Sequence, residues 1–233
     1  MGSECPVRSS SSSRARRPGG SHRLVAGAWL GAGLLVALPA TGAAQTGAAD
    51  SMVYRVDSTS RLEVRTGKSG LFGFAGHNHV IRARAPSGVI VYVPADPSRS
   101  RVSVAVAAES LEVLTPPDTA ERRKVTEAMR QDVLDTEQHP QISLVSRTLT
   151  PTADGFHLSA ALTLKGTTRE IPIDVKVGFH SDSLSATCTF SVKQSDFGIK
   201  PYRGGPAGTV KVADRVVFDI ALVGVKEVGR QAR

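Results

Sequence analysis

The sequence predicts an all-β protein with one helix: an antiparallel, up-and-down β-barrel of about eight strands with an amphipathic helix across it. Apolar and polar residues alternate through most of residues 53–225, which is typical of antiparallel strands with one covered face. Turn-forming residues separate these segments at short intervals, as the strands of a barrel or sandwich require. Helical spacing occurs in one segment, 118–134, and a single helix in a β protein must lie across an apolar opening or flank.

Residues 1–44 are predicted to be a secretory signal peptide. Four arginines between residues 14 and 23 precede an uncharged apolar segment at 24–40, and small residues follow it. We expect cleavage near residues 43–49, a small-residue linker at 45–51 and one domain at 52–228, in a periplasmic or secreted protein. The alternative is an uncleaved N-terminal anchor, because 17 apolar residues lie at the lower limit for a membrane span.

The charge and cysteine content argue against nucleic-acid binding and against a disulfide-stapled fold. Cleavage after Ala44 would remove five arginines and one glutamate, so the net charge would fall from +8 to +4. The remaining basic residues are spread along the chain without interleaved aromatics, so we expect no nucleic-acid partner. Cys188 alone would remain, which rules out an intramolecular disulfide, and its position on the apolar side of a strand predicts a buried thiol.

The first half of the domain is predicted to hold short strands separated by turns. Each alternates apolar and polar residues or is rich in valine and isoleucine. The first two strands are joined by a turn at 57–60, and the third segment is broken by glycines. The expected extended segments are 53–56, 62–66, 71–84, 88–93 and 101–107.

The segment 118–134 is predicted to be the helix. Two prolines at 116 and 117 cannot continue a strand, Asp118 can act as N-cap, and Glu121 completes a variant of the capping box. His139 precedes a proline, so the chain is expected to be extended there before a strand resumes at 141–144. The apolar stripe of the helix consists of Val125, Ala128, Met129 and Val133.

The second half of the domain alternates more clearly, and each strand collects its apolar side chains on one face. Turns are expected between these strands, where glycine, aspartate and serine cluster. In a barrel of about eight strands, such faces either fill a solid core or leave room for one small ligand. The strands are 158–164, 171–179, 184–192 and 216–222, and the turns are 153–155, 165–167 and 181–183.

An ordered series of segments resembles the YceI-like family of secreted bacterial proteins, and the likeness covers about residues 53–226. The segment 133–144 (VLDTEQHPQISL) looks like the most recognisable stretch of that family. The resemblance implies a lipocalin-like barrel that binds a polyisoprenoid lipid. The chain departs from many members in its paired His77 and His79 and in a short loop at 202–209. The similar segments are 54–60, 88–97, 102–106, 133–144, 162–169, 195–198 and 216–225.

The function that this resemblance and the strand pattern favour is non-catalytic binding or carriage of an amphiphilic isoprenoid lipid, such as a polyprenyl quinone, in the periplasm. The apolar strand faces would line a cavity, with Phe72, Phe74, Phe190 and Phe218 as bulky contributors. We expect no cofactor other than a bound isoprenoid lipid, and we leave open a transient membrane contact and a dimer. If the same residues fill a solid core, the alternative is a stress-response interaction module.

His77 and His79 are the candidate polar residues of the site. Residues i and i+2 of a strand point the same way, so the two imidazoles would lie side by side, in a geometry that suits a metal. A metal-dependent protein or enzyme that uses this pair is therefore an alternative, but a third ligand would be needed from His139, His157 or His180. The competing interpretation is a polar pair that hydrogen-bonds a lipid head group, or a neighbouring backbone group, at the mouth of the cavity. No catalytic motif accompanies the pair, so we predict no enzyme, no catalytic residue and no metal site.

Overall fold

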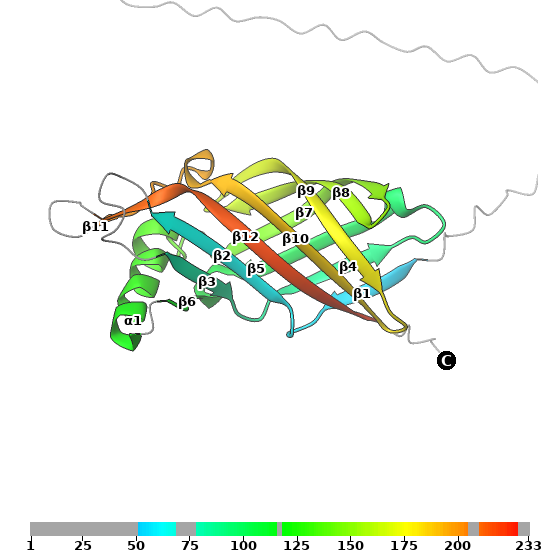
Figure 1. Cartoon of the computed structure of the whole chain (residues 1–233), viewed down its shortest axis with the longest axis horizontal. Coiled ribbons are helices and arrows are strands. Elements are labelled where there is room, and N and C mark those ends of the chain that lie inside the picture. The colour runs from blue at the N-terminus through cyan, green and yellow to red at the C-terminus, as the bar shows by residue number, and fades with distance from the viewer. Residues whose placement is uncertain (1–50, 69–77, 116–117, 205–209, 228–233) are drawn as a thin grey trace, which may run out of the picture. The chain divides into compact units, whose positions relative to one another are not determined.

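The computed structural model describes residues 51–68, 78–115, 118–204 and 210–227, which form an antiparallel β-barrel with one helix (Figure 1). The strands are β1 (Met52–Val56), β2 (Arg61–Lys68), β3 (His79–Ala83), β4 (Ser87–Tyr92), β5 (Arg101–Ala107), β6 (Leu111–Val113), β7 (Gln141–Thr152), β8 (Gly155–Leu164), β9 (Thr167–Phe179), β10 (Ser183–Lys193), β11 (Arg203–Gly204) and β12 (Val210–Lys226). The helical elements are α1 (Thr119–Ala128), the π-helical turn η4 (Met129–Leu134) and the 3-10 turns η2 (Pro97–Arg99), η3 (Ala108–Ser110) and η5 (Gln194–Phe197).

The sheet closes on itself, because β1 pairs with β4 on one side and with β12 on the other. The closed ring runs β1–β4–β5–β7–β8–β9–β10–β12, and β2, β3 and β6 extend it at one end. Every pairing is antiparallel, so the predicted eight-stranded, up-and-down barrel is confirmed.

Three long strands of the barrel are each divided by a bend into two shorter ones, β1 with β2, β3 with β4, and β5 with β6. β1 and β2 both run antiparallel to β12, so the turn predicted at 57–60 bends one strand without reversing it. Ser60 holds this bend against β12, since its Oγ accepts the Val223 N–H at 3.0 Å, and the Asp57 N–H donates to Val223 O at 2.8 Å. β3 continues into β4, and β5 continues through η3 into β6, in the same way. The sequence did not predict β6.

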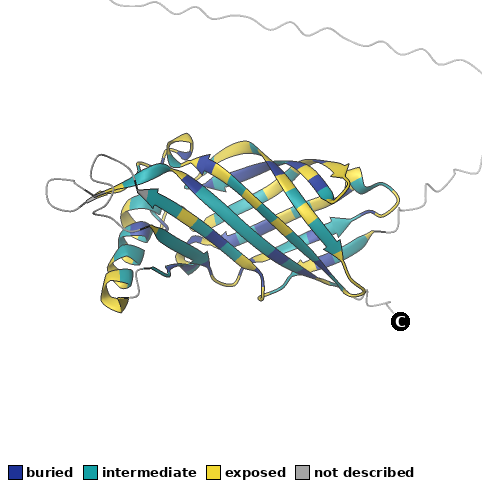
Figure 2. Ribbon diagram, viewed as in Figure 1, coloured by how far each residue is buried: buried dark blue, intermediate teal, exposed yellow. Residues whose placement is uncertain are grey.

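The alternation of the sequence decides which side chains face the interior. Buried and exposed positions follow each other along the strands in Figure 2. Along β8, Phe156, Leu158, Leu162 and Leu164 are all buried, while His157 points outward and is exposed. One face of each strand is therefore apolar and turned inward, as period-two patterning requires.

The predicted helix is present, but it changes geometry in its last turn. The Asp118 carboxylate accepts the Glu121 N–H at 2.7 Å, which confirms the N-cap. α1 ends at Ala128, and the chain continues as the π-helical turn η4 until Asp135, whose φ of 51° ends it. The helix lies at one end of the barrel (Figure 1), where Lys165 Nζ donates to Val133 O at 2.8 Å. Within the described part of the chain, no helix is long and apolar enough to cross a membrane.

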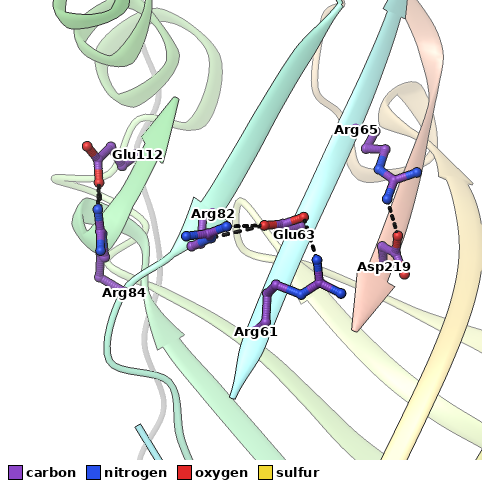
Figure 3. A network of polar contacts seen from close by, with 7 residues as sticks. All are labelled: Arg61, Glu63, Arg65, Arg82, Arg84, Glu112 and Asp219. Atoms are coloured by element: carbon purple, nitrogen blue, oxygen red, sulfur yellow. Dashed lines mark hydrogen bonds and ion pairs between the residues drawn. The ribbon is translucent and has the colours of Figure 1, made fainter. Parts of the chain in front are cut away.

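Glu63 is a nearly buried carboxylate on β2 (Figure 3). Its side chain is 8% exposed and accepts hydrogen bonds from Arg82 of β3 at 2.6 and 3.0 Å, while Arg61 lies 3.7 Å away. Exposed ion pairs contribute little stability, whereas a buried carboxylate without its partners would be costly. These contacts therefore hold β2 and β3 together at the helix end of the barrel. Flanking ion pairs join Arg65 to Asp219 and Arg84 to Glu112.

Gly166→Ala is expected to lower the free energy of unfolding by about 2 kcal/mol. Gly166 closes the β8–β9 turn at a φ of +71°, and an added Cβ would lie 2.9 Å from His139 Cε1. Gly198→Ala is the matched control, because Gly198 has a φ of +70° with nothing within 4 Å of the added Cβ. Urea unfolding should show a loss of about 1 kcal/mol in this control. Equal losses in the two variants would show that the contact with His139 is not restrictive.

Candidate functional site

The barrel encloses a cavity of about 530 Å³. The inward-facing residues of the strands form its walls, while α1 contributes Val125 and Ala128 at one end and η4 contributes Met129. Pockets of this volume, lined mainly by apolar side chains, are typical small-molecule sites. The barrel is therefore hollow, and the alternative of a solid core does not describe this structure.

The apolar faces predicted on β8, β9, β10 and β12 form much of this wall. Two of the predicted inward residues, Ala160 and Ile171, do not line the cavity. Ala160 is fully buried in a hydrophobic cluster with Leu158 and Ile173, and Ile171 packs against the same cluster. The lining residues of β10 are Leu184, Ala186, Cys188, Phe190 and Val192, and those of β12 include Val216, Phe218, Ile220 and Leu222.

Phe190 and Phe218 both lie on the cavity wall. They are opposite each other in the β10–β12 register, and their rings stack with centroids 4.8 Å apart and planes 5° apart. The sequence placed both residues on apolar faces but did not predict their pairing. Phe72, Phe74 and His77, the other predicted members of the site with His79, lie outside the described residues.

His79 lies on the inner face of β3 at the helix end of the barrel. Ile81 and Ala83, at alternate positions of the same strand, line the cavity as His79 does. The Nδ1 atom of His79 lies 2.9 Å from the carbonyl oxygen of Thr115, which holds the ring in place.

Most polar residues of the lining gather at this same end. The sequence predicted no charged side chain of α1 or β12 in the site, because a charged residue beside an apolar stripe usually remains in solvent. Here two exposed lysines, Lys124 and Lys211, nevertheless contribute to the lining of the cavity. The polar lining residues at the helix end are Thr66, His79, Glu121, Lys124, Gln194, Tyr202 and Lys211.

An aromatic pair lines the cavity away from the helix. Tyr92 at the end of β4 and Phe179 at the end of β9 have ring centroids 4.4 Å apart, and both line the cavity. Phe179 is nevertheless 45% exposed. A large apolar side chain that faces both the cavity and solvent marks a second end of the apolar space.

Cys188 is an unpaired thiol on the wall. Burial raises the pKa of this thiol to about 11, and the nearby Asp219 carboxylate adds to the shift. The thiol is therefore neutral at ordinary pH and behaves as a small apolar side chain, as the sequence suggested.

The described residues do not assemble a metal site around His79. They contain no group of three or more histidine, cysteine, aspartate or glutamate residues able to hold an ion. The proposed third ligands have other surroundings. The ring of His139 packs against Gly166, His157 Nδ1 lies 2.7 Å from Asp174 on the outer face, and His180 follows the end of β9.

Comparisons with known proteins agree with this architecture. Among solved structures, BcnA from Burkholderia cenocepacia is 18% identical, with a TM-score of 0.59 over 72% of this chain and 98% of that one. A polyisoprenoid-binding domain from Saccharophagus degradans is 14% identical, with a TM-score of 0.56 over 75% of this chain and 98% of that one. The YceI protein of Campylobacter jejuni is 15% identical, with a TM-score of 0.50 over 64% of this chain and 85% of that one.

At these identities the structural likeness establishes the fold alone. None of the curated proteins compared with the chain matches it. The model of the YceI-like domain, however, matches residues 54–224, nearly the whole of the barrel. The chain therefore belongs to the YceI-like domain family.

Proposed function

We propose that this protein binds or carries an amphiphilic isoprenoid lipid of the polyprenyl or quinone-like class, without catalysing a reaction on it. The observation that carries the proposal is the apolar cavity of about 530 Å³ inside the closed barrel. The S. degradans neighbour, described as a polyisoprenoid-binding domain, supports the same class of ligand. The predicted signal peptide supports action in the periplasm.

The length of the apolar wall favours a chain-like ligand. β10 presents lining residues at every second position from Leu184 to Val192, about 27 Å of strand at 3.4 Å per residue. A hydrocarbon tail gains about 0.8 kcal/mol for each methylene that leaves water. An extended isoprenoid tail would therefore use the wall along its length, and its polar head would lie among the polar residues at the helix end.

Mass spectrometry of an organic extract tests this proposal. The full chain is expressed with its own leader, and the mature protein is purified from a bacterial periplasm without detergent. We expect a near-stoichiometric isoprenoid lipid. The intact mass of the protein should correspond to a chain that starts within or just after the predicted cleavage region, residues 43–49. An unrelated periplasmic protein purified in parallel controls for lipid carried over from the membrane. An extract without lipid from well-folded protein would contradict the proposed function.

A further inference from the structure

The hydrogen bond of His79 determines which of its ring nitrogens carries a proton. Thr115 O is a carbonyl oxygen and can only accept, so His79 Nδ1 must donate in their 2.9 Å contact. In the neutral imidazole, Nε2 then has a free lone pair and acts as an acceptor.

The surroundings of Thr115 prevent the ring from exchanging its partner. Thr115 Oγ1 accepts the Val80 N–H at 3.0 Å and donates to Asn78 O at 3.1 Å. The Leu114 N–H donates to Val80 O at 2.8 Å, which continues the β3–β6 pairing up to this point. The carbonyl that holds His79 is therefore built into the sheet.

The Nε2 atom of His79 is left for a ligand. His79 lines the cavity, and its ring has no hydrogen-bond partner other than Thr115 among the described residues. Lys124 and Lys211, which also line this end, can only donate hydrogen bonds. Either lysine could donate to a hydroxyl oxygen whose own hydrogen is donated to His79 Nε2. A hydroxyl group can satisfy both kinds of neighbour, whereas an ether or carbonyl oxygen cannot donate to Nε2.

We infer that the His79 end of the cavity selects isoprenoid lipids whose head group carries a hydroxyl donor, a polyprenol or a reduced quinol, over acceptor-only heads such as ethers and quinones. This inference rests on the proposed function and adds the chemistry of the head group to it. His79 is the residue that makes the selection. Thr66, Glu121, Gln194 and Tyr202 also carry acceptor oxygens at this end, so the test must isolate the contribution of His79.

A pair of ligands that differ in one hydrogen-bond donor tests the inference. Dissociation constants of geranylgeraniol and its methyl ether are measured at pH 8 by competition against a fluorescent isoprenoid. We expect the wild-type protein to prefer the alcohol about fivefold to tenfold, the effect of about one hydrogen bond. In His79→Phe this preference should disappear. Both proteins are measured with the same two ligands, so the steric effect of the ether's methyl group cancels when their preferences are compared.

A matched control completes the design. His157→Phe places the same substitution on the outer face and should keep the wild-type preference. An equal affinity of the wild type for both ligands, or a preference that survives in His79→Phe, would overturn the inference and leave the proposed function standing. If well-folded wild-type protein bound neither ligand, the proposed function would fail too.

A second measurement tests the inference without a lipid. Nitrogen-15 chemical shifts of the His79 ring report which nitrogen is protonated. We expect a protonated Nδ1 and an unprotonated Nε2 at pH 8. The opposite tautomer would overturn the inference, whatever the protein binds.

Discussion

Phe218→Glu is expected to abolish lipid binding in a barrel that remains folded. The cavity is open space beside Phe218, so water can hydrate the new carboxylate while no lipid is bound. An isoprenoid tail would have to displace that water, and removing a charge from water without a partner costs several kcal/mol. Since about 1.4 kcal/mol corresponds to a factor of ten in affinity, the dissociation constant should rise at least a thousandfold.

Val217→Glu is the matched control. Val217 precedes Phe218 on β12, does not line the cavity, and lies opposite Arg65 of β2 in the register. It therefore adds the same charge to the outer face, and this variant should retain the wild-type amount of lipid. Phe218→Leu should also retain lipid, because it keeps the wall apolar. Lipid content is measured by mass spectrometry after circular dichroism has shown that each variant is folded. Wild-type lipid content in folded Phe218→Glu would show that Phe218 does not contact the ligand.

Much of the barrel could be predicted because the relevant signal is local. The alternation from Leu184 to Lys193 is enough to identify a strand and its inner face, since side chains point to opposite sides with a period of two. The N-cap at Asp118 and the turn at Lys165 and Gly166 could be predicted for the same reason, because each depends on a few neighbouring residues.

The features that sequence reasoning missed depend on partners distant in the chain. The bend at 57–60 is held by Ser60 against Val223, which is 163 residues away, so the turn signal could not reveal that the strand keeps its direction. The stacking of Phe190 on Phe218 follows from the β10–β12 register, which alternation alone does not specify. Whether the apolar faces meet or leave a cavity depends on the diameter of the closed ring, and the sequence was compatible with both outcomes.

The polar end of the site was partly predicted, through His79. Its i, i+2 partner His77 lies outside the described residues, and the other polar residues that line this end come from β2, α1, η5 and the segments around β11 and β12. Lys124 and Lys211 are 87 positions apart, and only the closed barrel brings both to the same rim. A sequence signal for such a cluster would require knowledge of the pairing between strands.

Cys188 is expected to react with iodoacetamide about 100-fold more slowly in the folded protein than in urea at pH 8, because the thiolate is the reactive form. Burial raises the pKa of this thiol from 9.0 to about 11, which lowers the thiolate fraction at pH 8 about 100-fold. The folded state thus favours the neutral thiol. Its contribution to stability is complete below pH 9 and is lost as the pH rises toward 11, the range in which folded Cys188 should become reactive.

Thr187→Cys in a Cys188→Ala background supplies the control for this experiment. Thr187 is exposed on the outer face of β10, next to Cys188 on the same strand, so its thiol should react at nearly the unfolded rate. Rates are followed by mass spectrometry with and without geranylgeraniol. The lipid should slow the reaction of Cys188 further, because it would occupy the space through which the reagent reaches the wall, and it should leave the Thr187→Cys variant unaffected. Equal rates for the two thiols would show that Cys188 is as accessible as a residue of the outer face, which would contradict its burial on the inner wall of β10.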